Sequence, residues 1–200
     1  MTFAEFKYLV KSDCFREYGS SSWKTFLTRF RYCPGARYTF YYRLTKFADS
    51  NRACRFLFRR IAYLLLHLAE ARAGIHVHSD AKIGPGLLFV HYGGIWISGL
   101  AKIGANCTIC QSVTIGGISD GPGKGAPTIG DNVYVGPGAV VSGEIHIGNN
   151  ALIGANSLIV SDVPDHGVVF GVPGKLFSKN GSSHFVHHID YRNYENSSES

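Results

Sequence analysis

The feature that most constrains the fold is a six-residue repeat that runs from residue 129 to residue 164. Aliphatic residues recur at every sixth position, and a second set of mostly small residues recurs four positions after each of them. This period fits neither the 3.6-residue repeat of an α-helix nor a hairpin array. It is a sequence signature of a parallel β-helix, in which each hexad forms one short strand and one corner. The first set is Ile129, Val135, Val141, Ile147, Ile153 and Ile159, and the second is Val133, Ala139, Ile145, Ala151, Ser157 and Val163.

Both sets are expected to point into a three-sided prism, with Gly and Asn at corners that need a positive φ. The predicted fold is therefore mainly β, a parallel β-helix of hexapeptide repeats. We expect residues 1–73 to form an α-helical cap, residues 74–178 the β-helix, and residues 179–200 a polar tail that frays. Helices are predicted at Phe3–Tyr18, Trp23–Tyr32, Arg37–Phe47 and, as the longest, Arg52–Ala73.

Two stretches interrupt the repeat. Ile83 and Ile97 belong to different registers, so the phase slips within Leu87–Trp96, around His91. The second interruption, Gly116–Pro127, is rich in glycine and nearly free of apolar residues, and we expect it to leave the prism as a loop. Excursions that spare the stacked core often form a binding face. The two interruptions are therefore the places where we expect function.

Basic residues are concentrated at the front of the chain. The net charge is +6, and residues 1–70 contain thirteen Lys or Arg against five Asp or Glu. These arginines are either solvated on a helical cap or rest on an anionic membrane or lipid-linked glycan. They are too dispersed for a nucleic-acid module. Because no signal peptide is visible and Ile61–Ala69 is too short to span a bilayer, we expect a cytoplasmic protein that can contact the inner face of the membrane.

The five cysteines are expected to be reduced, because their number is odd and the chain is taken as cytoplasmic. Cys107 and Cys110 have the spacing of a metal or redox half-site. Cys107, however, falls on an inward position of the repeat, so a core role is favoured for both. We expect no metal, because the remaining histidines, such as His166, lack cysteine or acidic partners at suitable spacing.

Several motifs resemble the serine acetyltransferase family of left-handed β-helix, hexapeptide-repeat acyltransferases. They are the segment from Ile83 to Gly94, the loop ending in Ala126-Pro127-Thr128-Ile129-Gly130, and the closing Gly171-Val172-Pro173-Gly174-Lys175. Within the family they look most like the branch found with bacterial surface-polysaccharide genes. The resemblance covers roughly residues 5–177. It implies a left-handed coil, a homotrimer, and acetyl-CoA as acetyl donor between neighbouring prisms.

The resemblance also implies that His91 is the catalytic base. A hydroxyl is a weak nucleophile at neutral pH, and an imidazole with a pKa near neutrality can remove its proton as it attacks a thioester. Without the resemblance, a histidine in a glycine-rich bend would be interpreted as an ordinary surface residue. His76 occupies the place of the family's carboxylate that orients this base, and we therefore include it among the candidate catalytic residues.

Other positions match the family's ligand contacts. For acetyl-CoA these are Gly117, Pro137, Ala155 and Lys175, and for the acceptor the candidates are Tyr92, Trp96 and Gln111. Small residues at corners are also what any β-helix needs, and a terminal lysine is often simply solvated. Each of these assignments therefore depends on the resemblance.

Three positions depart from the family pattern. Val90 stands where the family has an Asp beside the base, and Gly125 and Ala126 stand where it has an Arg-His pair. Because an amino acid would leave its charges unpaired in such a site, we expect O-acetylation of a sugar hydroxyl in a capsule, lipopolysaccharide or exopolysaccharide. The alternatives are serine O-acetylation in cysteine biosynthesis and a non-catalytic hexapeptide-repeat binding protein.

Overall fold

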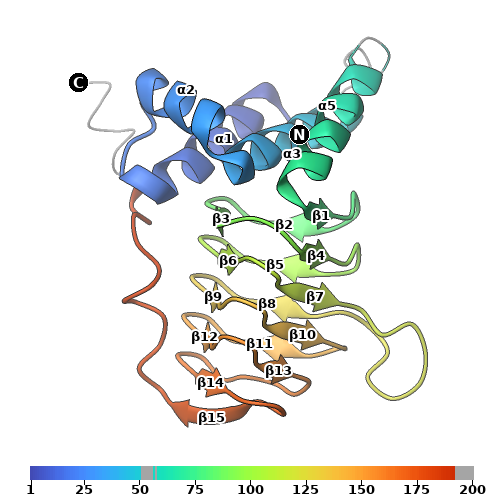
Figure 1. Ribbon diagram of the computed structural model, residues 1–200, viewed down its shortest axis with the longest axis vertical. Helices are drawn as coiled ribbons and strands as arrows, with labels where there is room; N and C mark the ends of the chain where they lie inside the picture. The colour runs from blue at the N-terminus through green and yellow to red at the C-terminus, as the bar shows by residue number, and fades with distance from the viewer. Residues whose placement is uncertain (51–55, 57, 192–200) are drawn as a thin grey trace.

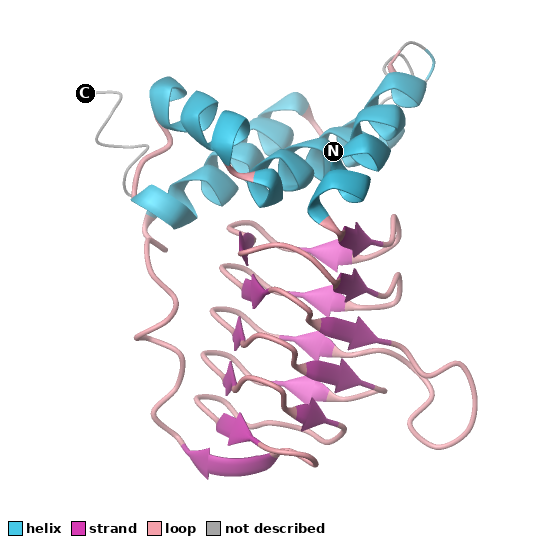
Figure 2. Cartoon of the chain, in the orientation of Figure 1, coloured by secondary structure: helices cyan, strands magenta, loops and turns pink. Residues whose placement is uncertain are grey.

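The computed structural model describes residues 1–50, 56 and 58–191. A layer of helices lies across one end of a three-sided β-helix (Figures 1 and 2). The helices are α1 (Phe3–Tyr18), α2 (Trp23–Tyr32), α3 (Pro34–Ser50) and α5 (Arg59–Ala73). The strands are β1 (Ile75–Val77), β2 (Lys82–Ile83), β3 (Leu88–Val90), β4 (Ile95–Ile97), β5 (Lys102–Ile103), β6 (Thr108–Cys110), β7 (Thr114–Gly116), β8 (Thr128–Ile129), β9 (Tyr134–Val135), β10 (Val140–Ser142), β11 (His146–Ile147), β12 (Leu152–Ile153), β13 (Leu158–Ile159), β14 (Val168–Phe170) and β15 (Lys175–Ser178).

Each side of the prism is a sheet. Sheet A has the order β1-β4-β7-β10-β13, sheet B the order β11-β8-β5-β2, and sheet C the order β15-β14-β12-β9-β6-β3. The chain visits the sheets in turn, and all neighbouring strands pair in parallel except β14 and β15, which are antiparallel. The coil is a left-handed parallel β-helix, as expected, and so departs from the usual right-handed crossover.

The hexads fill the interior of the prism as predicted. Ile129, Val135, Val141, Ile147 and Ile153 are all buried. Each strand of the lower turns pairs with the strand three hexads further along the chain, as Val140 of β10 does with Leu158 of β13. Burial of one such side chain is worth about 1.5–3 kcal/mol. The stack of similar turns is therefore stabilised mainly by apolar burial.

The helical layer is fastened to the first turn by polar contacts. Arg43 and Asp13 form an ion pair at 2.9 Å between groups that are almost fully buried. Asp13 Oδ1 also accepts from the backbone N–H of Leu87 at 2.8 Å, and Arg43 donates to the carbonyl of Ile83 at 2.9 Å. Tyr42 Oη donates to the carbonyl of Ala81 at 2.9 Å. These contacts hold α1 and α3 at a fixed position above the first turn.

Two of the predicted helices have the predicted bounds, and two differ. The third helix begins at Pro34 rather than Arg37, because proline suits the first position of a helix, where no intrahelical N–H bond is needed. The fourth helix is described from Arg59 to Ala73, and α3 is longer than that. Residues 52–55 and 57 of the predicted fourth helix lie outside the described residues. None of the described helices is long and apolar enough to cross a membrane.

The expectation of a frayed tail from residue 179 is wrong for residues 179–191. This segment, here called the C-terminal strap, runs back along the outside of the prism toward the helices (Figure 1). Gly181 N donates to the carbonyl of His166 at 3.0 Å, and Ser182 N donates to that of Asn150 at 2.9 Å. The Phe185 ring lies 4.8 Å from that of Tyr134. The strap is therefore held by hydrogen bonds to carbonyl groups at the corners of the β-helix. Its polar sequence gives no sign of these contacts.

Candidate active site

The first turn of the β-helix is longer than the regular turns below it. Leu88 of β3 pairs with Thr108, which is 20 residues further along the chain. Trp96 of β4 pairs with Thr114, which is only 18 residues further along. The additional residues lie in the corner between β3 and β4, where the phase slip was predicted. His91 sits in this corner with a φ of 61°, followed by Gly93 and Gly94 at 106° and 69°. The corner therefore projects the imidazole outward, where it is exposed to solvent.

Successive corners between sheets C and A stack below His91 and form what is here called the His91 edge. Ser112 N donates to the carbonyl of Gly93 at 2.8 Å, and Gly138 N to that of Gln111 at 3.0 Å. Asn156 N donates to the carbonyl of Pro137 at 2.8 Å. The structure therefore places four predicted site residues in one column: His91, Gln111, Pro137 and Ala155. Lys175 lies at the far end of the molecule, exposed at the start of β15 and opposite Phe170.

Gln111 is partly buried directly below the His91 corner. Its Oε1 atom is buried and has no hydrogen-bond partner within the described part of the chain. A buried amide oxygen without a donor costs about 1–3 kcal/mol. The Gln111 amide oxygen next to His91 therefore lacks a hydrogen-bond donor within the described part of this chain.

Sheet A lies between the His91 edge and the root of the loop at 116–127. His76 and Trp96 face outward on β1 and β4, with their rings stacked at 4.1 Å and 21°. His76 Nδ1 also bonds Glu70 Oε1, from the last turns of α5. Among the described residues no hydrogen bond joins His76 to His91. The structure therefore assigns His76 a carboxylate partner of its own, Glu70, which sequence reasoning missed.

The loop leaves the prism as predicted and projects to one side (Figure 1). The loop connects β7 of sheet A to β8 of sheet B, and Lys102 of β5 still pairs directly with Thr128 of β8, so the loop leaves the sheet pairing intact. Ile118 and Gly125 exchange backbone hydrogen bonds of 2.8 and 2.9 Å, and Glu144 N donates to the carbonyl of Gly123 at 2.9 Å. Gly117 stands at the root of this loop, at the border of sheet A away from the His91 edge.

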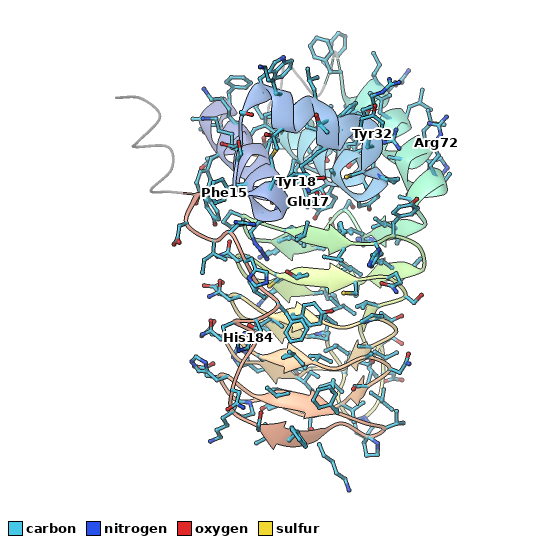
Figure 3. The ribbon with its side chains drawn as sticks, turned by 60° about the vertical axis from the view of Figure 1, so that its left-hand side comes forward. Phe15, Glu17, Tyr18, Tyr32, Arg72 and His184 are labelled. Carbon is cyan, nitrogen blue, oxygen red and sulfur yellow. The ribbon has the colours of Figure 1, made fainter. Side chains whose placement is uncertain are left out.

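A cleft of about 300 Å³ separates the helical layer from the first turn. One wall is the strand and corner Leu88–Tyr92, which brings His91, Tyr92 and Val90 together. The other wall is Glu17 at the end of α1 and the stretch Tyr32–Ala36 between α2 and α3. Figure 3 shows Glu17 and Tyr18 at the base of the helical layer, above the first turn. Trp96 and His76 lie on sheet A and are not among the residues that line this cleft.

Glu17 is the one carboxylate among the described residues that line the cleft. Its Oε2 lies 2.5 Å from Arg29 Nε, and its Oε1 accepts from the Cys33 thiol at 3.5 Å. Burial and then the Glu17 charge raise the pKa of Cys33, so this thiol stays protonated at neutral pH. Sequence reasoning missed both residues because they lie far before His91 in the chain, and no motif links them to it.

His91 thus belongs to two surfaces at once. It forms the top of the His91 edge and one end of the cleft beneath the helices. A long ligand on the edge would bring one end to the imidazole, where a small ligand in the cleft would meet it. Among the described residues, no group of three or more His, Cys, Asp or Glu is placed to hold a metal ion.

Comparison with known proteins gives matches at several levels. A family described as bacterial transferase hexapeptide (six repeats) matches residues 126–161. A serine acetyltransferase of Synechococcus elongatus is 41% identical over 121 residues, 60% of this chain and 50% of that protein. One of Staphylococcus aureus (strain Mu50) is 44% identical over 108 residues, 54% and 51% of the two chains. Among solved structures, Neisseria gonorrhoeae serine acetyltransferase in complex with serine is 30% identical with a TM-score of 0.70, covering 88% of this chain and 70% of that one.

This chain spans about half the length of the curated relatives it matches. Those relatives are named for serine acetylation and not for polysaccharide modification. The expectation of a surface-polysaccharide O-acetyltransferase is therefore wrong, and the alternative that named serine is better supported.

Proposed function

Because this chain belongs to the serine acetyltransferase family of left-handed β-helix acyltransferases, we propose that it transfers the acetyl group of acetyl-CoA to the hydroxyl of L-serine. The observation that supports this most strongly is the 41–44% identity to relatives named serine acetyltransferase. The geometry agrees with it, since an exposed imidazole stands where a long edge meets a small cleft.

In the proposed reaction, His91 acts as general base. Its free ring nitrogen removes the proton of the serine hydroxyl while the oxygen attacks the thioester carbonyl. The tetrahedral intermediate then expels the CoA sulfur, which takes the proton back from the imidazolium. The products are O-acetylserine and CoA, and no metal or redox step is required. Proton transfer by a positioned histidine contributes about 10²- to 10⁴-fold to such a rate.

The donor is proposed to lie along the His91 edge. Pro137 and Ala155 stack in this column, so their small side chains leave the backbone open to a ligand. Gly117 lies at the loop root on the opposite border of sheet A and would contact the donor only from a neighbouring prism, while Lys175 would meet its phosphates at the far end. A second prism facing this edge would enclose the ligand, and we propose a homotrimer because the resemblance to the family implies one. Gln111, whose amide oxygen lacks a donor among the described residues, would be completed in that closed site.

The expected sugar acceptor rests on three residues only, Val90 beside His91 and the loop residues Gly125 and Ala126. Val90 removes one carboxylate, but the cleft has a second wall built from the helical layer. That wall supplies the Glu17 carboxylate. A missing acid beside the base therefore still leaves one carboxylate on the cleft wall, where it is paired with Arg29. In the proposed site, Tyr92 borders the acceptor, while Trp96 and His76 lie on the adjoining face of sheet A.

The test is thiol release from acetyl-CoA with L-serine, together with mass detection of O-acetylserine. His91→Asn removes the base yet suits the positive φ of this corner, since asparagine occupies several such corners of the prism. The matched control is His166→Asn, a corner histidine with a φ of 59° at the other end of the β-helix. We expect a fall of about 10²- to 10⁴-fold for His91→Asn and no change for His166→Asn.

Three results would count against the proposal. Absence of serine-dependent release by the wild type would contradict the acceptor. Failure to bind acetyl-CoA would instead favour a non-catalytic hexapeptide-repeat protein. Equal rates for wild type and His91→Asn would show that another group is the base.

A further inference from the structure

We propose that the helical layer binds the surface of a membrane that contains anionic phospholipids, through a groove between α1 and α2. This inference goes beyond acetyl transfer and does not depend on the identity of the acceptor. None of the described helices is long and apolar enough to cross a membrane. The contact is therefore peripheral, with the helical layer lying on the lipid surface.

The groove, here called the α1–α2 groove, lies where these two helices pack against each other in the helical layer (Figure 1). Its volume is about 460 Å³, and its described lining contains no residue of the β-helix and none of the cleft at His91. The apolar part of the lining includes Phe6, Val10, Phe26 and Phe40. Lys7 and Lys11 line the same groove, and no Asp or Glu is among its described lining residues. Such a groove suits apolar chains that carry an anionic group.

Large apolar side chains around the α1–α2 groove are exposed to solvent. Trp23, which lines the groove, is 70% exposed, and Leu27 follows it one turn later on α2 with 47% exposed. On α1, Phe3 is 65% exposed and stands one turn before Lys7. Tryptophan is enriched at the level of lipid headgroups, where its ring is partly apolar and partly wet. Apolar side chains next to cations on surface helices are typical of a segment that lies in a membrane interface.

The positive charge of the helical layer is not balanced by its own carboxylates. Residues 1–70 contain thirteen Lys or Arg and five Asp or Glu. Each of the five carboxylates already has a partner: Glu5 the backbone N–H of Thr2, Asp13 Arg43, Glu17 Arg29, Asp49 Arg59, and Glu70 His76. Lys7, Lys24 and Arg31 are exposed and form no ion pair with a described carboxylate. A cation near an anionic membrane strengthens binding roughly fivefold, so these groups favour an anionic surface as partner.

The same charge argues against a second copy of this chain as the occupant of the groove. Two copies would bring their excess cations together, and like charges that face each other weaken an interface. A membrane with anionic headgroups supplies negative charge and an apolar interior side by side. That combination matches the arrangement of Lys7 and Trp23 on one groove.

The first experiment uses Trp23 as the probe. The chain contains two tryptophans, so Trp96→Phe leaves Trp23 as the only indole. Its emission is recorded with vesicles of phosphatidylcholine, with vesicles of equimolar phosphatidylcholine and phosphatidylglycerol, and with inorganic phosphate. We expect a blue shift, and quenching by brominated acyl chains, with the anionic vesicles alone. An equal response to inorganic phosphate would show an anion site that needs no membrane and would overturn the proposal.

Co-sedimentation of the full chain with the anionic vesicles tests the residues. Lys7→Gln should lower the partition coefficient roughly fivefold, because one cation is lost. Trp23→Ser should lower it roughly tenfold, because a large apolar side chain no longer leaves water. The matched controls are Lys179→Gln and Phe177→Ser, which replace an exposed lysine and an aromatic residue that is 79% exposed, both beyond the last turn of the β-helix. Both controls should sediment as the wild type does, and circular dichroism checks that all four variants fold.

Binding should also weaken as salt is added, because salt shortens the range of the attraction between the cations and the headgroups. Absence of binding, or equal binding to neutral vesicles, would overturn the proposal. Unchanged sedimentation of both Lys7→Gln and Trp23→Ser would show that another surface binds the lipid. A changed oligomeric mass of these two variants without vesicles would identify the groove as a contact between copies instead. Serine turnover measured without vesicles tests the proposed function separately.

Discussion

The lower turns of the β-helix and its first turn are both built from hexapeptide repeats, but the lower turns are regular and the first turn is interrupted. After Thr128 the strands pair in the register that the repeat predicts, as Tyr134 does with Leu152, and their interior is aliphatic. In the first turn the register is interrupted, a histidine occupies an exposed corner, and charged helices cover the end. The regular part supplies a rigid frame. The irregular part uses that frame to hold polar groups at fixed positions.

The two regions also differ in their source of stability. Residues such as Ile147 and Ile153 contribute through burial of apolar surface. The junction above them adds buried polar contacts, centred on Asp13 with Arg43, to the apolar packing of Tyr38 against Phe89. A buried ion pair is costly to break but stabilises little in net terms. The junction is thus suited to fixing geometry, and the hexads are suited to supplying free energy.

The largest effect is expected in the regular turns. Ile153→Ala should lower the free energy of unfolding by about 2–5 kcal/mol, because its side chain is fully buried and neighbouring turns cannot collapse into the cavity. Acetyl transfer at room temperature should stay unchanged. Urea denaturation followed by circular dichroism measures the first quantity, with Val160→Ala, exposed on the surface, as control. A loss of activity without a loss of stability would contradict the view that the regular turns provide stability and the first turn provides the active site.

A smaller effect is expected at Arg16, where the helices meet the C-terminal strap. Arg16 is 2% exposed and donates to Thr108 Oγ1 at 2.8 Å, to the carbonyl of Asn106 at 3.1 Å and to that of His187. Burial lowers its pKa to about 10, yet it stays charged at neutral pH. Arg16→Met leaves these acceptors without this donor and should cost about 1–3 kcal/mol.

Hydrogen exchange is the sharper measurement for this variant. Amides of residues 181–191 should exchange faster in Arg16→Met, while those of β9 and β12 keep their protection. Lys24→Met, an exposed cation on α2, is the control. Unchanged exchange in the strap would mean that its corner contacts alone hold it, without the helical layer.

The loop at 116–127 should matter less for stability than for binding. Deletion of residues 118–125 would return Lys102 and Thr128 to the spacing of the regular pairs, such as Val140 with Leu158. We expect a change in unfolding free energy below about 1 kcal/mol, since loop length contributes little. The KM for acetyl-CoA should rise roughly tenfold, the equivalent of about one lost contact. A large loss of stability would show that the excursion is part of the frame.

The same division explains what could be predicted from the sequence. The period of six determined the strands, the register and the core, because each hexad repeats one local environment. The slip around His91 was visible as a break in that period. Glu17, Glu70 and the strap were not visible, because their contacts join segments that carry no periodic signal. The sugar acceptor expected from the sequence is wrong for the same reason, since Val90 lies on only one wall of the cleft.

The smallest effect is expected for the buried cysteines among the described residues, of which Cys107 and Cys110 lie in the β-helix and Cys14 in α1. Cys14, Cys107 and Cys110 are buried, and burial raises the pKa of each thiol, that of Cys107 to about 12. At pH 8 in the folded protein they should resist iodoacetamide, whereas the partly exposed Cys33 should react slowly, as peptide mass spectrometry would detect. All four should react in urea.

The pH dependence of this labelling follows from the folded state holding its thiol protons more tightly than the unfolded state. Between about pH 9 and 12 the unfolded chain has lost the Cys107 proton while the folded chain keeps it, so stability falls as pH rises through this window. Labelling of Cys107 should therefore increase above pH 9 in step with global unfolding. If Cys107 and Cys110 react together at pH 8, without unfolding, their turn opens locally, and the regular part of the prism is less rigid than its repeat implies.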